Sequence, residues 1–394
     1  MDAQHILVSG AGIGGLTAAL CLAQAGHRVE VFEQAAILAG VGAGIQLSAN
    51  GMRVMHHLGL LPKIAALSFL PEGVEMRDWR SGQVIASTTL GAEAQTRFGF
   101  PYFHIHRADL ISVLLQGIRE NASIQLHIGS AVEGFSQSES QVSVTVNDQT
   151  HRADLLVGAD GIHSRVRTGL FGAEAPTFTG NVAWRGLVPA SLLPEDLVRP
   201  VTTAWWGPGK HFVHYFVRQG ELVNCVCVVE KTGWDTESWT ARGDLQELQT
   251  DFAGWHGAIQ TLIEHMDPRE CYKWALFDRP PMPQWGRGRV TLLGDACHPT
   301  LPFMAQGAVM AIEDGAVLAQ CLAAEGSVAA ALGRYENIRR KRTASVQRGS
   351  RRNARVFHLD GLQARLRNSA AKFASSAMMD SIYSHNVFAE FESV

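Results

Sequence analysis

Cysteine is scarce in this 394-residue sequence, and neither sign of charge is in excess. The six cysteines are scattered without a C-x-x-C pair, so the usual zinc-binding and disulfide-rich patterns are absent. We therefore expect no metal site and a location in the reducing cytoplasm. A net charge of -3 gives no reason to expect nucleic acid or an anionic membrane surface as a partner.

A signal peptide and a membrane span are not expected either, although residues 6–26 carry no charge. The stretch lacks the basic residues that begin a signal peptide, and glycines crowd into residues 10–15. We predict a strand, a loop and a buried helix here.

The length of the chain exceeds that at which one hydrophobic core usually stops growing, so we expect more than one domain. A hydrophobic content of 46% with 18% charged residues is ordinary for an α/β enzyme. We predict a discontinuous first domain at 1–73, 96–180 and 275–335, a second domain at 74–95 and 181–274, and a C-terminal helical region at 336–394.

The motif GAGIGG follows a short apolar strand at 6–9 and opens a predicted helix at 16–25. Gly10, Gly12 and Gly15 have the spacing that allows a tight turn and close approach of the backbone to a pyrophosphate. Glu33 ends the next predicted strand, where it would accept hydrogen bonds from an adenosine ribose. The alternative is a glycine-rich turn without a ligand, but the strand, helix and terminal acid together favour a dinucleotide site.

A second long motif, GDACHPTLPFMAQG at Gly294–Gly307, stands between a predicted strand at 289–293 and a predicted helix at 308–322. β-branched and apolar residues favour the strand, and apolar residues at helical spacing favour the helix. The first backbone N–H groups of a helix are unpaired and carry partial positive charge, so they attract an anion. The sequence therefore predicts a phosphate or cofactor site here.

Two shorter segments also suit a nucleotide. Arg107 begins a predicted helix, where it would bind a pyrophosphate, although an ion pair with Asp109 explains it as well. Asp160 and Gly161 follow a buried-strand pattern at 153–158. A further glycine-rich loop at 40–50 is either a flexible connection or backbone lying against a flat ring.

The remaining patterns outline the second domain and the C-terminus. Alternation of apolar and polar residues predicts an antiparallel meander at 202–206, 212–218 and 222–229. Three other segments, at 126–128, 130–136 and 142–146, predict a small antiparallel sheet. The basic cluster at 339–342 lies on a helical pattern, and we expect it to be a solvated face.

Three motifs now stand in order: GAGIGG, then Asp160-Gly161 with Ser164 and Arg167, then Gly294-Asp295 followed by Pro302 and Gly307. This ordered set resembles the FAD-dependent aromatic hydroxylases, the single-component flavoprotein monooxygenases similar to p-hydroxybenzoate hydroxylase. The resemblance covers essentially the whole chain and is strongest to the salicylate, 3-hydroxybenzoate and 6-hydroxynicotinate hydroxylases. It implies an α/β fold with a Rossmann-like FAD-binding domain, an inserted mixed or antiparallel β-sheet substrate domain and a helical C-terminus.

The resemblance also implies where FAD binds. Asp295 would bind the ribityl chain, and the loop from Pro302 to Gly307 would lie beside the flavin pyrimidine, with the helix that starts at Ala308 stabilising its negative charge. Asp160 and Gly161 would serve both FAD and the nicotinamide cofactor. No second G-x-G-x-x-G is present, which fits NADH or NADPH as a transient electron donor. The ADP half of FAD would be held by Gly10, Gly12, Gly15, Glu33 and Arg107.

His211 and Tyr215 lie four residues apart on a predicted strand, hence on the same face. They match positions where the resembling hydroxylases have an active-site His and Tyr, so both are candidates for catalysis and substrate binding. A neutral His211 would draw the proton from a substrate phenol, although an ordinary hydrogen-bonded histidine is the alternative. Gln306 is a further candidate for substrate contact, and Gln46 stands where the resembling nicotinate hydroxylase has a His.

The predicted function is hydroxylation of a phenolic aromatic or heteroaromatic acid with NAD(P)H and O2 through a C4a-hydroperoxyflavin, as in aromatic hydrocarbon catabolism. Its partners would be the small aromatic substrate and O2, and a homodimer is common among the resembling enzymes. Two alternatives are a FAD-dependent reductase or epoxidase on the same fold, and a non-catalytic FAD- or NAD-binding sensor. A plain NAD-dependent dehydrogenase is a weaker alternative, because it would be colourless when purified.

Overall fold

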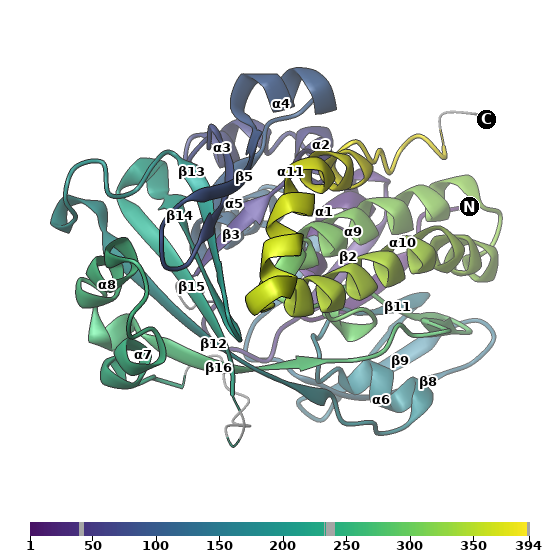
Figure 1. Ribbon diagram of the computed structural model, residues 1–394. Coiled ribbons are helices and arrows are strands. Elements are labelled where there is room, and N and C mark those ends of the chain that lie inside the picture. Colours follow the sequence, from purple (N-terminus) through teal and green to yellow (C-terminus); the bar gives the residue numbers. More distant parts are fainter. Residues whose placement is uncertain (39–42, 232, 234–240, 392–394) are drawn as a thin grey trace.

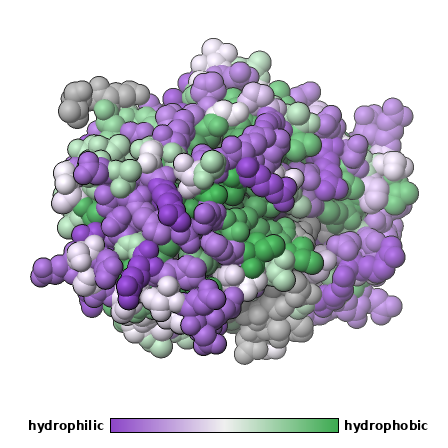
Figure 2. Space-filling view, turned by 180° about the vertical axis from the view of Figure 1, so that it is seen from behind, coloured by the Kyte–Doolittle hydropathy of each residue, from purple (hydrophilic) through white to green (hydrophobic). Residues whose placement is uncertain are grey.

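A computed structural model describes residues 1–38, 43–231, 233 and 241–391 of the chain. The first residues of the glycine-rich loop expected at 40–50 lie outside the described residues, and its end forms strand β3 (Gly44–Leu47) and helix α2 (Ala49–His57). Seen from behind, the surface is largely hydrophilic, with apolar side chains gathered in a central region (Figure 2).

The main sheet has six strands in the order β17-β18-β11-β1-β2-β7. Five of them are parallel, and β17 pairs antiparallel with β18. The strand expected at 289–293 is present as β18 and completes this sheet beside β11, as the dinucleotide fold requires. The strands are β1 (His5–Ser9), β2 (Arg28–Phe32), β7 (Ile124–His127), β11 (Leu155–Gly158), β17 (Gly286–Arg287) and β18 (Val290–Leu292).

Helices α1 (Ile13–Gln24) and α9 (Gly307–Ala324) pack tightly against each other beside the main sheet (Figure 1). A Cβ at Gly315 would lie 2.9 Å from the backbone of Ala18, so only glycine allows this approach. Among the described helices, α9 alone is long and apolar enough to cross a membrane, but 72% of its residues are buried inside the protein. It is the core helix of this fold.

The second sheet has seven strands in the order β16-β12-β15-β14-β13-β4-β5. The predicted meander is confirmed, because β13, β14 and β15 pair antiparallel in succession. The division of the chain into domains remains a prediction. The strands are β4 (Gly73–Asp78), β5 (Val84–Thr89), β12 (Thr177–Pro189), β13 (Val201–Gly207), β14 (Lys210–Val217), β15 (Leu222–Glu230) and β16 (Tyr272–Asp278).

One of the three strands predicted for the small antiparallel sheet belongs to the main sheet instead. Residues 124–127 form β7 and pair parallel with β2 in the main sheet, because Leu126 adds to the apolar core there. The small sheet instead consists of β8 (Val132–Gln137), β9 (Val142–Val146) and β10 (Gln149–Ala153). The last of these strands is polar and exposed on most positions, so its sequence carries little strand signal.

Two long helices end the chain. α10 (Val328–Phe357) packs on α9, and α11 (Gly361–Tyr383) runs along β5 of the second sheet (Figure 1). The other helices are α3 (Leu61–Ala65), α4 (Gly91–Phe98), α5 (Arg107–Arg119), α6 (Arg165–Phe171), α7 (Leu245–Asp251) and α8 (Gly257–Glu264), and β6 (Phe103–His106) pairs with β3.

Candidate functional site

A cavity of about 1590 Å³ lies between the carboxyl ends of the main-sheet strands and the inner face of the second sheet. Open parallel sheets bind their ligands at this edge. Helix α11 closes one side of the cavity with residues such as Gln363 and Arg367. The cavity therefore collects side chains from nearly the whole length of the chain.

The start of α1 opens onto this cavity. Gly10 has φ +104°, and a Cβ there would overlap the carbonyl of Ala159, while a Cβ at Gly15 would overlap the carbonyl of Gly10. Gly12 caps the helix without a side-chain hydrogen bond, and the first turn holds no acidic residue. The unpaired N–H groups are thus free to bind an anion.

The carboxylate of Glu33, at the end of β2, steadies this glycine loop. It accepts hydrogen bonds of 2.8 Å from the backbone N–H groups of Ala11 and Ala35. Glu33 thus lies next to Gln34 and Ala35, which line the cavity, and its two oxygens are already engaged; its role as a ribose ligand stays a prediction.

Arg107 and Asp295 are far apart in the sequence but both line the cavity. Burial lowers the pKa of Arg107, and Asp295 opposes that shift. Asp295 projects into the cavity. Desolvation by the surrounding protein raises the pKa of its carboxyl group, although His298 and Arg107 act to lower it. The alternative partner of Arg107, Asp109, is instead paired with Arg218 at 3.0 Å.

Asp160 presents an unsatisfied atom to the cavity. Its Oδ2 accepts hydrogen bonds from the N–H groups of Arg165 and Val166 at the start of α6, at 2.8 and 3.2 Å. Its Oδ1 is buried without a partner in the described part of the chain. A ligand with a donor group would satisfy that oxygen, since buried polar atoms are normally hydrogen-bonded.

The start of α9 offers a second open helix terminus. A short 3-10 turn at Pro302–Met304 and a left-handed Ala305 bring the chain around to Gly307 and Ala308, which line the cavity. No side chain caps α9, and its first turn holds no acidic residue. A negative group in front of this terminus would be stabilised.

The second sheet supplies one wall through alternate residues. On β14, His211, Val213 and Tyr215 face the cavity, as the predicted strand periodicity requires. On β13, Trp206 faces the cavity, whereas Trp205 lies in the core on the other side of the sheet. Most of the other residues on this wall are apolar, so the wall suits a flat aromatic ring.

His211 is buried between the rings of Phe303 and Phe357, with centroids 5.0 and 5.5 Å away. Burial, with a smaller contribution from His358, holds its pKa well below the ordinary value. A neutral imidazole facing the cavity can act as a proton acceptor.

A cluster of tyrosines around Tyr215 was not predicted from the sequence. Tyr102 donates a 2.5 Å hydrogen bond to Gln46, its ring lies 5.5 Å from that of Tyr383, and the ring of Tyr215 lies 4.5 Å from that of His104. Three of the five tyrosines in the chain line this one cavity. Burial raises the pKa of Tyr215, so its hydroxyl stays a hydrogen-bond donor.

Two arginines that were also missed face the cavity. Arg185 stacks 4.7 Å over Trp274, forms no ion pair among the described residues, and leaves its Nε without a partner. Arg367 stacks 4.9 Å over Trp206 and donates to the carbonyl oxygens that end α10. Positive charge without a carboxylate partner in a largely apolar cavity favours an anionic ligand.

Gln306 does not reach the cavity. Its amide is buried and forms hydrogen bonds with Ser48 and Asn50 at 3.0 and 3.3 Å. His298, in the same loop before α9, is equally buried and lies 2.6 Å from Asp314. The expected substrate contact of Gln306 is thus replaced by a role in supporting the loop before α9.

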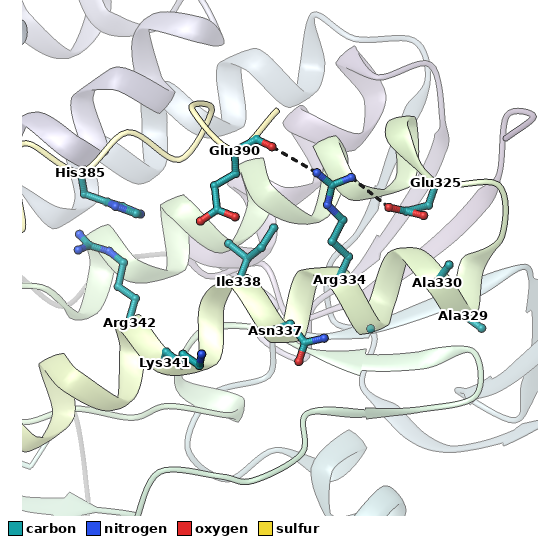
Figure 3. Close-up of a pocket in the computed structure, with 11 residues that line it drawn as sticks. Glu325, Ala329, Ala330, Arg334, Asn337, Ile338, Lys341, Arg342, His385 and Glu390 are labelled. Atoms are coloured by element: carbon teal, nitrogen blue, oxygen red, sulfur yellow. Dashed lines mark hydrogen bonds and ion pairs between the residues drawn. The ribbon is translucent and has the colours of Figure 1, made fainter. Parts of the chain in front are cut away.

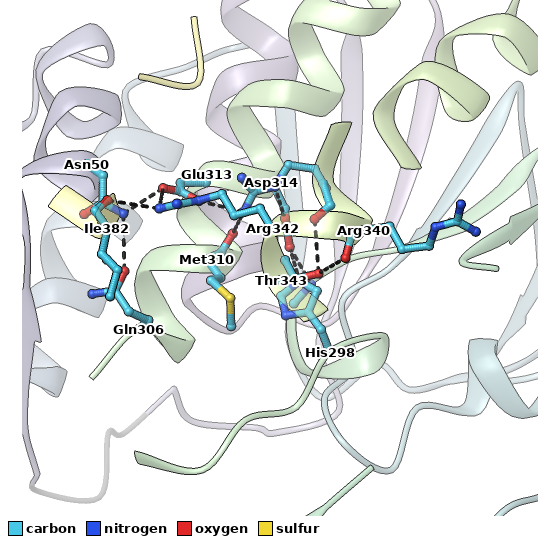
Figure 4. A network of polar contacts seen from close by, with 12 residues as sticks. Asn50, His298, Gln306, Met310, Glu313, Asp314, Arg340, Arg342, Thr343 and Ile382 are labelled. Carbon is cyan, nitrogen blue, oxygen red and sulfur yellow. Dashed lines mark hydrogen bonds and ion pairs between the residues drawn. The ribbon is translucent and has the colours of Figure 1, made fainter. Parts of the chain in front are cut away.

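Both residues join a buried polar network that Figure 4 shows in detail. Arg339 pairs with Glu313 and Asp314 of α9, both at 2.7 Å, and Arg342 pairs with Glu313 at 2.9 Å. Asp314 also accepts a 3.0 Å hydrogen bond from the N–H of Gly294. The network therefore holds the turn that presents Asp295.

The solvated face predicted at 339–342 is wrong for two of its four residues. Arg339 is fully buried and Arg342 is partly buried, with 14% of its side chain exposed, whereas Lys341 is exposed. The sequence of a basic cluster does not indicate which of its residues pair with carboxylates on a neighbouring helix.

A shallower hollow of about 830 Å³ lies beside α10 (Figure 3). Of its two arginines, Arg334 is satisfied by Glu325 at 3.0 Å and by the carbonyl of Glu390 at 3.2 Å, and Arg342 pairs with Glu313 at 2.9 Å. We assign no ligand to it. Among the described residues, no group of three or more His, Cys, Asp or Glu is placed to hold a metal ion.

The cavity thus fits a long anionic cofactor joined to a flat ring. One part of the cavity is lined by two open helix termini, the glycine cradle and the unsatisfied oxygen of Asp160. Another part is lined by an apolar wall that carries His211 and Tyr215.

Comparison with known proteins agrees with this geometry. Residues 3–350 match the model of the family described as FAD binding domain. The chain is 40% identical to a 3-amino-4-hydroxybenzoate 2-monooxygenase from Streptomyces platensis, over 92% of this chain and 91% of that protein. It is 37% identical to a 6-hydroxynicotinate 3-monooxygenase from Bordetella bronchiseptica, over 89% and 91%. The Klebsiella pneumoniae protein HpxO, solved with FAD and uric acid, superimposes with a TM-score of 0.85 at 30% identity, over 96% of this chain and 97% of that one.

Proposed function

The chain belongs to the FAD-binding-domain family of flavoproteins, and we propose that it is an NAD(P)H-dependent monooxygenase that hydroxylates a phenolic aromatic or heteroaromatic acid. The observation that carries this proposal is the buried His211 on the wall of the cavity that suits FAD, where burial holds the pKa of the imidazole below its ordinary value. When bound, FAD accepts a hydride from NADH or NADPH and then activates O2 for transfer of one oxygen atom.

His211 removes the proton from the hydroxyl group of the substrate. Loss of that proton pushes electron density into the ring and makes a ring carbon more nucleophilic. The apolar neighbours of His211, Phe303 and Phe357, keep water from the reacting atoms. Tyr215, whose hydroxyl remains protonated, orients the substrate by donating a hydrogen bond.

The acid group of the substrate complements the positive charge of the cavity. Arg185 and Arg367 both line it, and the cavity places no carboxylate in an ion pair with either of them among the described residues. The named relatives act on a hydroxybenzoate and a hydroxynicotinate, which both combine a ring hydroxyl with a carboxylate. We infer a substrate with the same two groups.

On the cofactor side, we assign the glycine cradle of Gly10, Gly12 and Gly15, with Arg107, to the diphosphate of FAD and Glu33 to its ribose. Asp295 is assigned to the ribityl chain, and the start of α9 at Gly307 and Ala308 to the flavin ring. Asp160 and Gly161, with the unpartnered Oδ1 of Asp160, serve FAD and the visiting nicotinamide cofactor.

We place the enzyme in the cytoplasm, because its six cysteines are free and buried. A homodimer remains a prediction from the resemblance. Light scattering during size-exclusion chromatography would test it, and a mass of 42.8 kDa would count against it.

The test of the function is NADH and NADPH oxidation by the yellow protein across a panel of aminohydroxybenzoates, hydroxybenzoates and hydroxypyridine carboxylates, with peroxide and product measured together. We expect at least one compound to accelerate oxidation and to gain one oxygen atom. If all reducing power emerges as peroxide for every compound, the hydroxylase proposal fails.

A further inference from the structure

Three side chains form a line from the cavity to the protein surface. His211 Nδ1 lies 2.8 Å from His358 Nε2, and His358 Nδ1 lies 2.8 Å from Glu230 Oε1. Both histidines are buried, whereas 56% of the Glu230 side chain is exposed. The line therefore joins an enclosed imidazole to solvent through one intermediate ring.

The backbone holds this line in place. His358 follows directly on the last residue of α10, Glu230 ends β15, and His211 lies near the start of β14. Gly209, in the turn before β14, donates a 3.1 Å hydrogen bond to the carbonyl of His358 and accepts one of 2.9 Å from the N–H of Glu230. One turn thus fixes all three elements relative to one another.

With both imidazoles neutral, the contacts assign the ring protons as follows. The carboxylate of Glu230 can only accept, so His358 donates from Nδ1 and its Nε2 is an acceptor. His211 must then donate from Nδ1, which leaves its Nε2 without a proton. Since Nδ1 points to His358, Nε2 is the nitrogen available to a substrate, and it is in the form a general base needs.

We propose that His358 and Glu230 carry the substrate's proton between His211 and solvent. This inference rests on the proposed function. The substrate hydroxyl gives its proton to His211 Nε2, His211 passes the Nδ1 proton to His358 Nε2, and His358 passes its Nδ1 proton to Glu230. Each imidazole ring gains one proton and loses one, and no step transfers electrons. When the product oxygen regains a proton, the reverse passage restores the starting tautomers.

The surroundings of His211 offer no comparable route. Its ring neighbours other than His358 are Phe303 and Phe357, and His358 is its one side-chain hydrogen-bond partner in the described part of the chain. A base in such a place needs an exit for the proton it takes, because a buried imidazolium is costly. Burial and nearby Arg367 lower the pKa of His358 while Glu230 raises it, so His358 favours passing its proton on.

The experiment measures ionisation of a bound phenol, which does not require hydroxylation. The FAD-bound protein is mixed with 3-hydroxy-4-nitrobenzoate, whose phenolate is coloured, and the appearance of phenolate is followed by stopped flow after a jump to higher pH. His358→Asn and Glu230→Gln are compared with wild type. The matched controls are His214→Asn, a buried histidine on the opposite face of β14, and Glu221→Gln, an exposed glutamate just before β15.

We expect His358→Asn to slow ionisation by at least roughly tenfold, as loss of a positioned proton acceptor does, without weakening probe binding to the same extent. Glu230→Gln should slow it less and should recover with high concentrations of formate, a small proton carrier. Both controls should match wild type. If His358→Asn does not fold, Glu230→Gln and its rescue still decide the question, because that side chain is exposed.

Two outcomes separate the relay from the function on which it rests. If His211→Asn abolishes ionisation while His358→Asn and Glu230→Gln retain the wild-type rate, the relay is overturned and the hydroxylase proposal stands. If His211→Asn ionises the bound probe as wild type does, the proposed role of His211 fails and the relay fails with it.

Discussion

Loss of hydration shifts the pKa values of His211 and Asp295 in opposite directions at the same cavity, although His211 is buried and the Asp295 side chain is exposed to the cavity. The pKa of the imidazole falls and that of the carboxyl group rises, because each charged form loses water that the protein only partly replaces. For His211 this produces a base that is ready to act. The carboxyl group of Asp295 would be stabilised by a hydrogen-bonding or charged ligand.

Asp295→Ala should weaken FAD binding. The variant loses a charged acceptor that faces the cavity and leaves Arg107 without its nearby carboxylate. Removing a hydrogen bond to a charged group costs roughly 1.5–3 kcal/mol, which is about 10- to 100-fold in affinity. The ratio of flavin to protein absorbance after desalting reports this loss, and a fully flavinated variant would contradict the ribityl assignment.

His211→Asn should retain FAD but lose hydroxylation. Asparagine keeps a polar group near His358 but cannot accept a proton at neutral pH. Product formation should fall by ~10²-fold or more, the usual contribution of a general base. Flavin content and product are measured on the same preparation, and unchanged product formation would remove His211 from the mechanism.

At the scale of elements, α9 and α10 are joined through charge as well as through apolar packing. Burial by itself raises the pKa of Glu313, but Arg339 and Arg342 outweigh that effect and hold its pKa well below the ordinary value. His298 and Arg339 likewise outweigh the effect of burial on Asp314 and lower its pKa. A carboxylate held ionised inside the core depends on every partner being present.

Arg339→Met should therefore destabilise the fold far more than the small difference in side-chain size between arginine and methionine suggests. Two buried carboxylates would lose a partner, and breaking a buried pair costs about 3–5 kcal/mol. Lys341→Met, two residues along α10 and exposed, is the matched control and should stay within about 0.5 kcal/mol of wild type. Urea unfolding compares the two, and equal midpoints would show that the network contributes little. The FAD content of the Arg339 variant should fall as well, because Asp314 holds Gly294.

At the scale of the whole molecule, the parts that follow from local patterns were predicted from the sequence. The glycine cradle, the strand before Gly294 and the alternation that brings His211 and Tyr215 to one face all depend on neighbours within a few residues. Tyr102, Arg185 and His358 were missed because each meets the cavity or His211 only through tertiary packing. Gln306 was misassigned for the same reason: the loop before α9 is close to the flavin site, but side-chain direction there depends on Ser48, which is far away in the sequence.

Stability should fall as the pH is lowered from about 7 to about 5. Burial lowers the pKa of His104 and of His214 to about 3, against about 6.5 in an unfolded chain. Between these values the unfolded state binds more protons than the folded state, so unfolding becomes easier as pH falls. Each histidine then lowers the free energy of unfolding by about 2 kcal/mol at pH 5, since one pH unit corresponds to about 1.4 kcal/mol per proton.

Glu313 and Asp314 have lowered pKa values and would weaken the fold only in stronger acid, below about pH 4.

The measurement is the urea midpoint of the FAD-saturated protein at both ends of this range. A His104→Asn and His214→Asn double variant should lose less stability between the two pH values than wild type, whatever its stability at neutral pH. A wild-type midpoint that stays constant down to about pH 5 would mean that these imidazoles reach solvent before the protein unfolds, because only a group that remains buried can keep so low a pKa.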